Sequence, residues 1–206
     1  MRRILLSIYT LLITFSVTSA QVESGFGLRA GLGLSKYTIS VDGTSVNFGT
    51  DANIYVRAAY VLPVAFGGAI QLEAGYSGRG IDLNDNSFLG GDEAALNLSY
   101  LDFGAFYRQQ FGSGSVSFFV LGGPLISLGL SGNAEANGIK EDINFEDSGF
   151  NRLDLGIELG AGLLFGPQRN IAVEVRYSNG FIDLGQDFDD GNFTHSAFNF
   201  GLGYFF

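Results

Sequence analysis

Most of the chain alternates between apolar residues and small or polar residues with a period of two. The last segment shows the pattern most clearly, because Phe198, Phe200 and Leu202 fall in one phase and Asn199 and Gly201 lie between them. Successive side chains of a β-strand point to opposite faces. The segment is therefore predicted to be a strand with one apolar face.

Seven more segments along the chain are predicted to be strands, and most of them show the same alternation. The eight expected strands cover residues 25–37, 52–62, 67–80, 94–111, 115–130, 150–165, 170–182 and 194–206. In the fourth strand, Leu98 and Leu101 are in opposite phases, and a β-bulge near Tyr100 would bring them to one face. The apolar run at residues 118–121 leaves the faces of the fifth strand open.

The connections between these strands alternate in length. Long connections cover residues 38–51, 81–93, 131–149 and 183–193, and short turns cover residues 63–66, 112–114 and 166–169. Long loops at one end and tight turns at the other are typical of outer-membrane barrels. The pattern therefore predicts an all-β fold, an eight-stranded antiparallel transmembrane β-barrel.

Glycine decides which face of the strands is inside. The chain has 31 glycines in 206 residues, about twice the ordinary usage, and many lie opposite the apolar face. A soluble eight-stranded barrel would turn its apolar face inward and show water a glycine-rich surface. The interior of an eight-stranded barrel is just wide enough for side chains to fill. The small and polar face is therefore expected inside, and the apolar face against lipid.

Charged residues on the inward face are expected to form a network in the lumen, because buried charges need partners. The predicted members are Arg29, Arg57, Glu73, Asp102, Arg108, Asp154, Glu158, Glu174 and Arg176. The alternative is that these side chains line a proton or ion path. A salt-bridged plug is favoured, because eight strands leave no channel of porin size.

The first twenty residues have the form of a secretory signal peptide. Arg2 and Arg3 precede a mostly apolar stretch at residues 4–17, and small residues lead up to Ala20. This arrangement predicts cleavage after Ala20, with an N-terminal membrane anchor as the alternative. We expect residues 1–20 to be the signal peptide and residues 21–206 to be the barrel domain in the outer membrane of a Gram-negative bacterium.

Charge and cysteine content exclude several classes of function. The formal net charge is −10, from 21 acidic and 11 basic residues. Such a surface repels phosphate, so nucleic acid is not an expected partner. The chain has no cysteine, which excludes disulfides, thiolate nucleophiles and cysteine-ligated metals. No cofactor is expected.

Candidate chemistry is sparse. His195 and Ser196 suggest a hydrolase, but adjacent residues of a strand face opposite sides and do not readily pair. The acidic segment at residues 187–192 offers oxygen ligands of the kind that calcium prefers. It lacks the bidentate glutamate of an EF-hand, since that position is Phe198. A solvated acidic loop is the favoured interpretation, and no catalytic or metal site is predicted.

Several segments resemble a known family. The stretches LSYLDFGAFYRQQF at residues 98–111, RLDLGIELGAGLLF at residues 152–165 and VEVRYSNGF at residues 173–181 are similar to the PorT-type outer-membrane β-barrel family of Bacteroidota. The resemblance covers the whole mature chain and implies a barrel of the OmpA and OmpX type. It also implies that Tyr204 and Phe206 belong to a C-terminal signal read by the outer-membrane insertion machinery.

These observations favour a non-enzymatic outer-membrane protein whose barrel anchors acidic extracellular loops. Its expected partners are outer-membrane lipid, the insertion machinery during assembly, and an envelope protein that contacts the long loops. The alternatives are a narrow pore for ions or small solutes and, less favoured, a lipid-modifying enzyme that depends on His195.

Overall fold

The computed structural model describes residues 22–41, 44–82, 94–112, 114–136, 138–143, 145, 151–166, 168–184 and 191–206. They form nine antiparallel strands: β1 Gly25–Val41, β2 Thr44–Pro63, β3 Gly68–Asp82, β4 Ala94–Phe111, β5 Val116–Ala136, β6 Ile139–Ile143, β7 Leu153–Phe165, β8 Ile171–Gly180 and β9 Gly191–Phe205. Within these ranges, no helix is long and apolar enough to cross a membrane.

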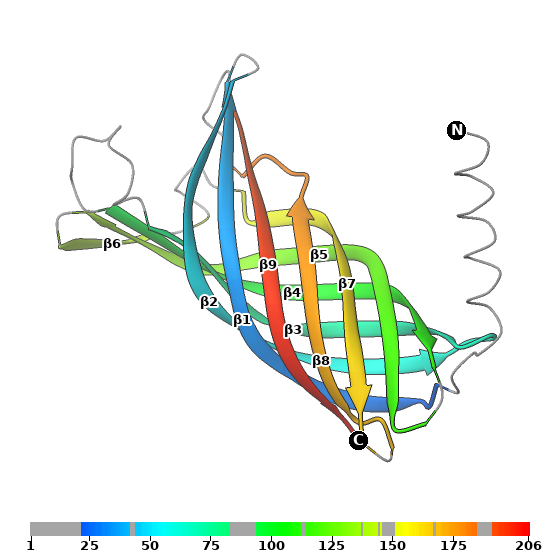
Figure 1. The fold of residues 1–206 in the computed structure, drawn as a ribbon. Coiled ribbons are helices and arrows are strands. Elements are labelled where there is room, and N and C mark those ends of the chain that lie inside the picture. The colour runs from blue at the N-terminus through cyan, green and yellow to red at the C-terminus, as the bar shows by residue number, and fades with distance from the viewer. Residues whose placement is uncertain are drawn as a thin grey trace, which may run out of the picture.

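The sheet closes on itself into a barrel of eight strands (Figure 1). Within the ring, each strand pairs with the next along the chain, and β5 is followed in the ring by β7. The ring closes where β1 pairs with β9. The remaining strand, β6, is joined to the sheet through β5. The predicted eight-stranded antiparallel barrel is thus confirmed, with one additional short strand outside the ring.

The apolar face of the strands points outward. Leu32, Phe200 and Val175 lie side by side on three neighbouring strands, and each is more than 40% exposed. Their neighbours in the opposite phase of each strand, such as Arg176 and Asn199, are buried in the interior. A continuous apolar belt around a polar interior is the arrangement that lipid requires of a barrel.

Tight turns close one end of the barrel. Phe66 and Gly67 between β2 and β3 adopt positive φ, as do Gly166 and Arg169 between β7 and β8. The chain segment before β1 and the C-terminal Phe206 lie at the same end (Figure 1). Short turns mark the periplasmic end of outer-membrane barrels, so we call this end periplasmic and the opposite end extracellular.

The strands extend further at the extracellular end than the sequence pattern predicted. Residues 38–51 and 131–149 were expected to be long loops. Instead, β1 and β2 remain paired as far as Val41 and Thr44, and β5 continues into an antiparallel pair with β6. Apolar residues still alternate with polar ones in the extension of β1, at Tyr37, Ile39 and Val41. Backbone pairing with β2 continues through these residues, so the strand runs on where a loop was expected.

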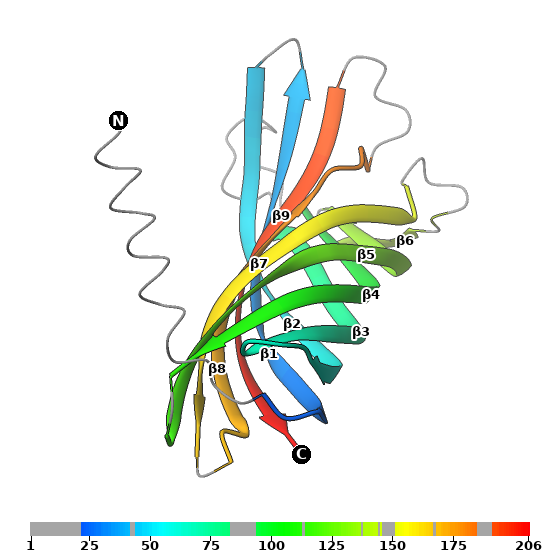
Figure 2. The ribbon, with the colours of Figure 1, turned by 90° about the vertical axis from the view of Figure 1, so that its right-hand side faces the viewer.

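The extracellular strand extensions separate into two groups. Strand β2 pairs with β3 only from Tyr55 onward, so residues 44–54 pair with β1 alone. In Figures 1 and 2, β1, β2 and the start of β9 rise together, whereas the extensions of β4, β5 and β6 leave in another direction. The closed barrel thus carries two diverging hairpin structures.

The bulge that the sequence pattern predicted in the fourth strand does not lie in β4. Leu98, Tyr100 and Asp102 all face the interior, so β4 keeps one phase throughout. The register shift lies in the partner strand, where Leu130 of β5 is the extra residue. Leu98 and Tyr100 are apolar on the inner face because they pack inside the extracellular mouth. In the run at residues 118–121, Phe119 and Leu121 point inward.

Candidate functional site in the barrel lumen

Three arginines and three glutamates meet at the centre of the lumen. Arg176 donates hydrogen bonds to Glu73 at 2.9 Å, to Glu158 at 2.8 Å and to Glu174 at 3.0 Å. Arg29 forms ion pairs with Glu73 and Glu174, and Arg57 donates to Glu158 at 3.0 Å. All six side chains are buried. We call these six residues the central cluster.

A second group of charges lies on the extracellular side of the central cluster. Arg79 donates to Asp154 at 2.7 Å and to Asp102 at 3.1 Å. Ser127 donates to Asp102 at 2.6 Å, and the Arg79 guanidinium lies 4.2 Å from the centre of the Tyr100 ring. We call Arg79, Asp102 and Asp154 the upper cluster. Arg57 connects the two clusters through a contact of 2.8 Å with Asp102.

Glycine makes room for this packing. The side chain of Tyr55 packs against Gly31 of β1 and Gly201 of β9, which are paired. A Cβ atom on Gly201 would collide with the Tyr55 hydroxyl, and one on Gly31 would lie 2.8 Å from the ring. The Tyr55 ring in turn lies under two guanidinium groups, 5.8 Å from Arg29 and 5.6 Å from Arg57. The glycine-rich inner face therefore provides the space that large charged and aromatic side chains fill.

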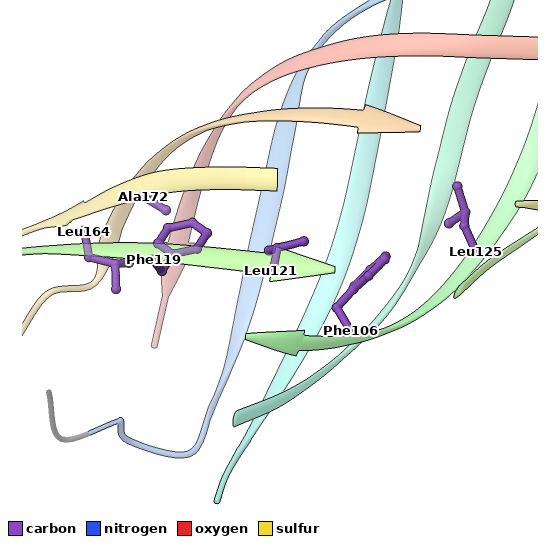
Figure 3. Packing of buried hydrophobic residues seen from close by; sticks show 6 residues of the cluster. All are labelled: Phe106, Phe119, Leu121, Leu125, Leu164 and Ala172. Carbon is purple, nitrogen blue, oxygen red and sulfur yellow. The ribbon is translucent and has the colours of Figure 1, made fainter. Parts of the chain in front are cut away.

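Two apolar clusters pack beside the lumen charges. At the extracellular end, Tyr37 stacks on Phe193 with ring centres 5.0 Å apart and packs against Leu98, Tyr100 and Leu184. The other cluster, which we call the periplasmic cluster, comprises Phe106, Phe119, Leu121, Leu125, Leu164 and Ala172 (Figure 3). It reaches from the periplasmic mouth, where Leu164 lines a pocket, up to Leu125, which borders a small cavity with Arg79 and Asp154.

The structure brings together eight of the nine residues predicted for the lumen network. The ninth, Arg108, is also buried but lies apart from the carboxylates, and donates instead to the side-chain oxygens of Gln71 and Gln110. Arg79 is not among the residues predicted from the sequence. Its position was available, since Arg79 shares the phase of Glu73 on β3, and it brings the buried charges to five arginines and five carboxylates.

His195 lies in the extracellular half of the lumen. It is 3% exposed, and its ring centre is 5.0 Å from that of Tyr37. It borders two cavities of about 10 Å³ each, one of which also contacts Asp154. Ser196 belongs to the opposite phase of β9 and is half-buried. The pair does not form a dyad.

Metal-binding groups do not gather in the part of the chain that the structure describes. No cluster of three or more histidine, cysteine, aspartate or glutamate side chains suited to a metal ion occurs there. The acidic segment at residues 187–192 lies mostly outside the described residues, as does the expected signal peptide at residues 1–20.

The last aromatic residues of the chain lie on the outside of the barrel. Tyr204 is 46% and Phe206 75% exposed, and their ring centres are 5.2 Å apart in an edge-to-face arrangement. Phe205 between them points toward the lumen, 5.2 Å from the Arg108 guanidinium.

Comparisons with known proteins found one family model and several solved structures to which this chain is similar. A family model described as an outer membrane protein beta-barrel domain matches residues 19–186. Neisserial surface protein A (NspA) superposes with a TM-score of 0.50 at 13% identity, covering 90% of this chain and all of that one. OprG from Pseudomonas aeruginosa gives 0.48 at 13% identity, covering 92% and 99%. Ail from Yersinia pestis, solved with the heparin analogue sucrose octasulfate, gives 0.43 at 17% identity, covering 90% and 100%.

No curated protein matches the chain in sequence. At identities this low, the likeness to solved structures describes the fold.

Proposed function

The chain belongs to the family of outer membrane protein β-barrel domains, and from this premise we propose that it is a non-conducting, non-enzymatic anchor in the outer membrane of a Gram-negative bacterium. The barrel holds two extracellular hairpin structures for contact with an envelope partner. The observation that carries the proposal is the filled lumen, in which five arginines and five carboxylates are buried and two apolar clusters pack beside them.

The lumen charges favour a plug over a pore. An ion path needs charges that face water, whereas the arginines and glutamates of the central cluster are bonded to one another. The cavities beside the upper cluster measure about 10 Å³, which is roughly the room that one water molecule needs. Removing one member of such a network would leave its partner buried and uncompensated, so the pairs hold each other in place.

Conductance in a planar bilayer tests the plug. We expect the refolded chain to insert without discrete current steps. A Glu158→Gln, Arg176→Gln double variant removes one charge of each sign from the central cluster. Discrete steps in the wild type that change in this variant would favour the pore and contradict the plug.

The position of His195 supports a non-enzymatic role. Its ring is buried under Tyr37, beside cavities that have no room for a lipid chain. We expect no hydrolysis of phospholipid or lipopolysaccharide by the refolded protein. Turnover that His195→Ala abolishes, while the variant keeps its heat-modifiable gel mobility, would establish the enzyme alternative instead.

The interaction role rests on the strand extensions. Strand β6 is almost wholly exposed and carries Lys140, Glu141 and Asp142, and Ile139 beside them is 69% exposed. A photo-crosslinker at Ile139 is expected to capture an envelope protein in the source bacterium. The same crosslinker at Leu202, which faces lipid, is the control. Identical adducts from both positions would contradict a contact at the hairpin.

We also propose that the chain is of the PorT type within this family, on the segments at residues 98–111, 152–165 and 173–181. We propose further that Tyr204 and Phe206 belong to a C-terminal signal read by the outer-membrane insertion machinery, and that a signal peptide cleaved after Ala20 directs export. The mass of the protein purified from outer membranes tests the cleavage, since a mature chain that begins at Gln21 is expected.

A further inference from the structure

A pocket of about 80 Å³ lies at the periplasmic mouth of the barrel. The residues before β1, the turn between β7 and β8 and the end of β9 form its rim, and Arg108, Gln110 and Leu164 belong to its inner wall. In this measure, one water molecule needs roughly 10–15 Å³. The pocket therefore has room for a group of several heavy atoms.

Arg108 in this pocket differs from the other buried arginines. Arg29, Arg57, Arg79 and Arg176 each form at least one ion pair. Among the described residues, no carboxylate pairs with Arg108, which is 3% exposed. Its Nη1 and Nη2 atoms donate to the neutral side chains of Gln71 at 3.0 Å and Gln110 at 3.2 Å. Its Nε atom is buried and has no hydrogen-bond partner among these residues.

The surroundings hold this guanidinium in place. The ring centre of Phe119 is 4.5 Å and that of Phe205 is 5.2 Å from its central carbon. Phe119 belongs to the periplasmic cluster (Figure 3), and Phe205 packs against that cluster. The amide of Gln110 donates onward to Ser117 at 3.0 Å, and that of Gln71 to Glu73 at 2.5 Å. Both glutamines are thereby oriented with their oxygens toward Arg108.

We propose that this pocket is a binding site for a small oxyanion, a carboxylate or phosphate group, from the periplasm. A buried cation without an ionic partner is costly, and a guanidinium has five N–H donors, of which the glutamines use two. An oxyanion would accept the remaining donors through a charge-assisted, fork-like contact. The apolar wall of Leu164 and the Phe205 ring lowers the local dielectric constant and strengthens that contact.

The rim of the pocket carries a carboxylate, whose removal is expected to have the opposite effect on anion binding from the removal of Arg108. Glu23 lines the pocket and is exposed, so it repels an incoming anion. We expect Arg108→Gln to abolish anion binding and Glu23→Gln to tighten it by about twofold, the size of a typical exposed charge effect. Lys140→Gln removes one positive charge from exposed β6 at the other end and serves as the matched control.

The experiment uses the chain at residues 21–206, refolded in an uncharged maltoside detergent that brings no phosphate. Sodium phosphate and sodium acetate are titrated separately at constant ionic strength, with sodium chloride as reference. We expect the side-chain Nε–H signal of Arg108, observed by NMR after ¹⁵N-arginine labelling, to shift saturably with phosphate, acetate or both. The unfolding temperature is expected to rise with the same salt, since an anion bound only to the folded state stabilises it.

The outcomes separate the site from a general salt effect. Loss of the temperature rise in Arg108→Gln, with the rise retained in Lys140→Gln, supports the site. An Arg108 signal unmoved by either salt overturns it, and so does an equal temperature rise in all variants. A phosphate-bearing lipid added to the micelles forms a second arm. A shift with that lipid and none with the soluble salts would overturn a soluble periplasmic ligand.

Discussion

The guanidinium of Arg57 and the carboxylate of Asp102 lie 2.8 Å apart and join two otherwise separate groups of buried charges. The other ion pairs of the lumen lie within the central cluster or within the upper cluster. Asp102 therefore compensates one arginine of each group. This contact makes the lumen one network rather than two.

Removal of the charge on Asp102 tests that position in the network. Asp102→Asn leaves both Arg57 and Arg79 short of a carboxylate, and loss of one partner of a buried pair costs about 3–5 kcal/mol. We expect a loss of this size in the free energy of unfolding, measured by urea titration in lipid vesicles. Asp142→Asn on exposed β6 is the control and is expected to change stability by less than about 0.5 kcal/mol. An equal loss of unfolding free energy in the two variants would mean that Asp102 stabilises the barrel no more than an exposed carboxylate does.

Arg79 and Asp154 provide a double-mutant cycle. Arg79→Met leaves Asp154 without an arginine and Asp102 with Arg57 alone, and Asp154→Leu leaves Arg79 with Asp102 alone. We expect the double variant to lose less stability than the sum of the single variants, with a coupling of about 0.5–3 kcal/mol. The exposed pair of Glu135 and Lys140, 3.2 Å apart, is the comparison cycle.

That comparison cycle is expected to give a smaller coupling, because exposed pairs contribute about 0–1 kcal/mol. A coupling at Arg79 and Asp154 no larger than at Glu135 and Lys140 would contradict the role assigned to the upper cluster.

The contact between Gly201 and Tyr55 predicts a steric defect with a specific rescue. Gly201→Ala places a Cβ where the Tyr55 hydroxyl lies, and overpacking costs about 1–3 kcal/mol. Tyr55→Phe removes the hydroxyl and is expected to restore most of that loss in urea unfolding. Gly78→Ala is the control, since its new Cβ would be 3.4 Å from the nearest atom. Failure of the rescue would place the clash elsewhere.

The apolar belt predicts a difference between two exposed positions. Phe200 is 51% exposed within the belt, and Ile139 is 69% exposed on β6. We expect Phe200→Arg to reduce folding stability in bilayers by about 2–4 kcal/mol, the cost of a lipid-facing arginine near the midplane. Ile139→Arg is expected to have no measurable effect. A tolerated Phe200→Arg would contradict the orientation of the strands.

The C-terminal signal predicts a defect in cells that is absent in the test tube. Phe206 is 75% exposed and contacts the Tyr204 ring at its edge, so Phe206→Ala removes little packing. We expect the variant to refold in micelles like the wild type but to accumulate less in the outer membrane. Val64→Ala, an exposed residue of a periplasmic turn, is the control. Equal amounts in the outer membrane would remove Phe206 from the signal.

Most of the fold could be predicted from the sequence because each residue of a barrel strand faces either lipid or the lumen. Ile171, Val173 and Val175 meet lipid and Ala172, Glu174 and Arg176 meet the lumen, so each residue's type follows from its own position. The prediction from this pattern was wrong in β4, where the inner face changes from the charged lumen to the apolar extracellular mouth. Leu98 and Tyr100 are apolar inside the extracellular mouth, and their phase suggested a bulge in β4 that the strand does not have.

The amino-acid sequence by itself determined the number of strands in the ring and, for six of the eight, the face that the strand presents to lipid. It also predicted nine charged residues in the lumen, of which the structure brings eight together. Only the tertiary structure decided which charges pair, that Arg79 completes the set, and that Arg108 lies without a carboxylate. Period-two alternation assigns a side chain to a face but not to a height in the barrel. That height depends on the stagger of the strands, which is set when β1 closes on β9.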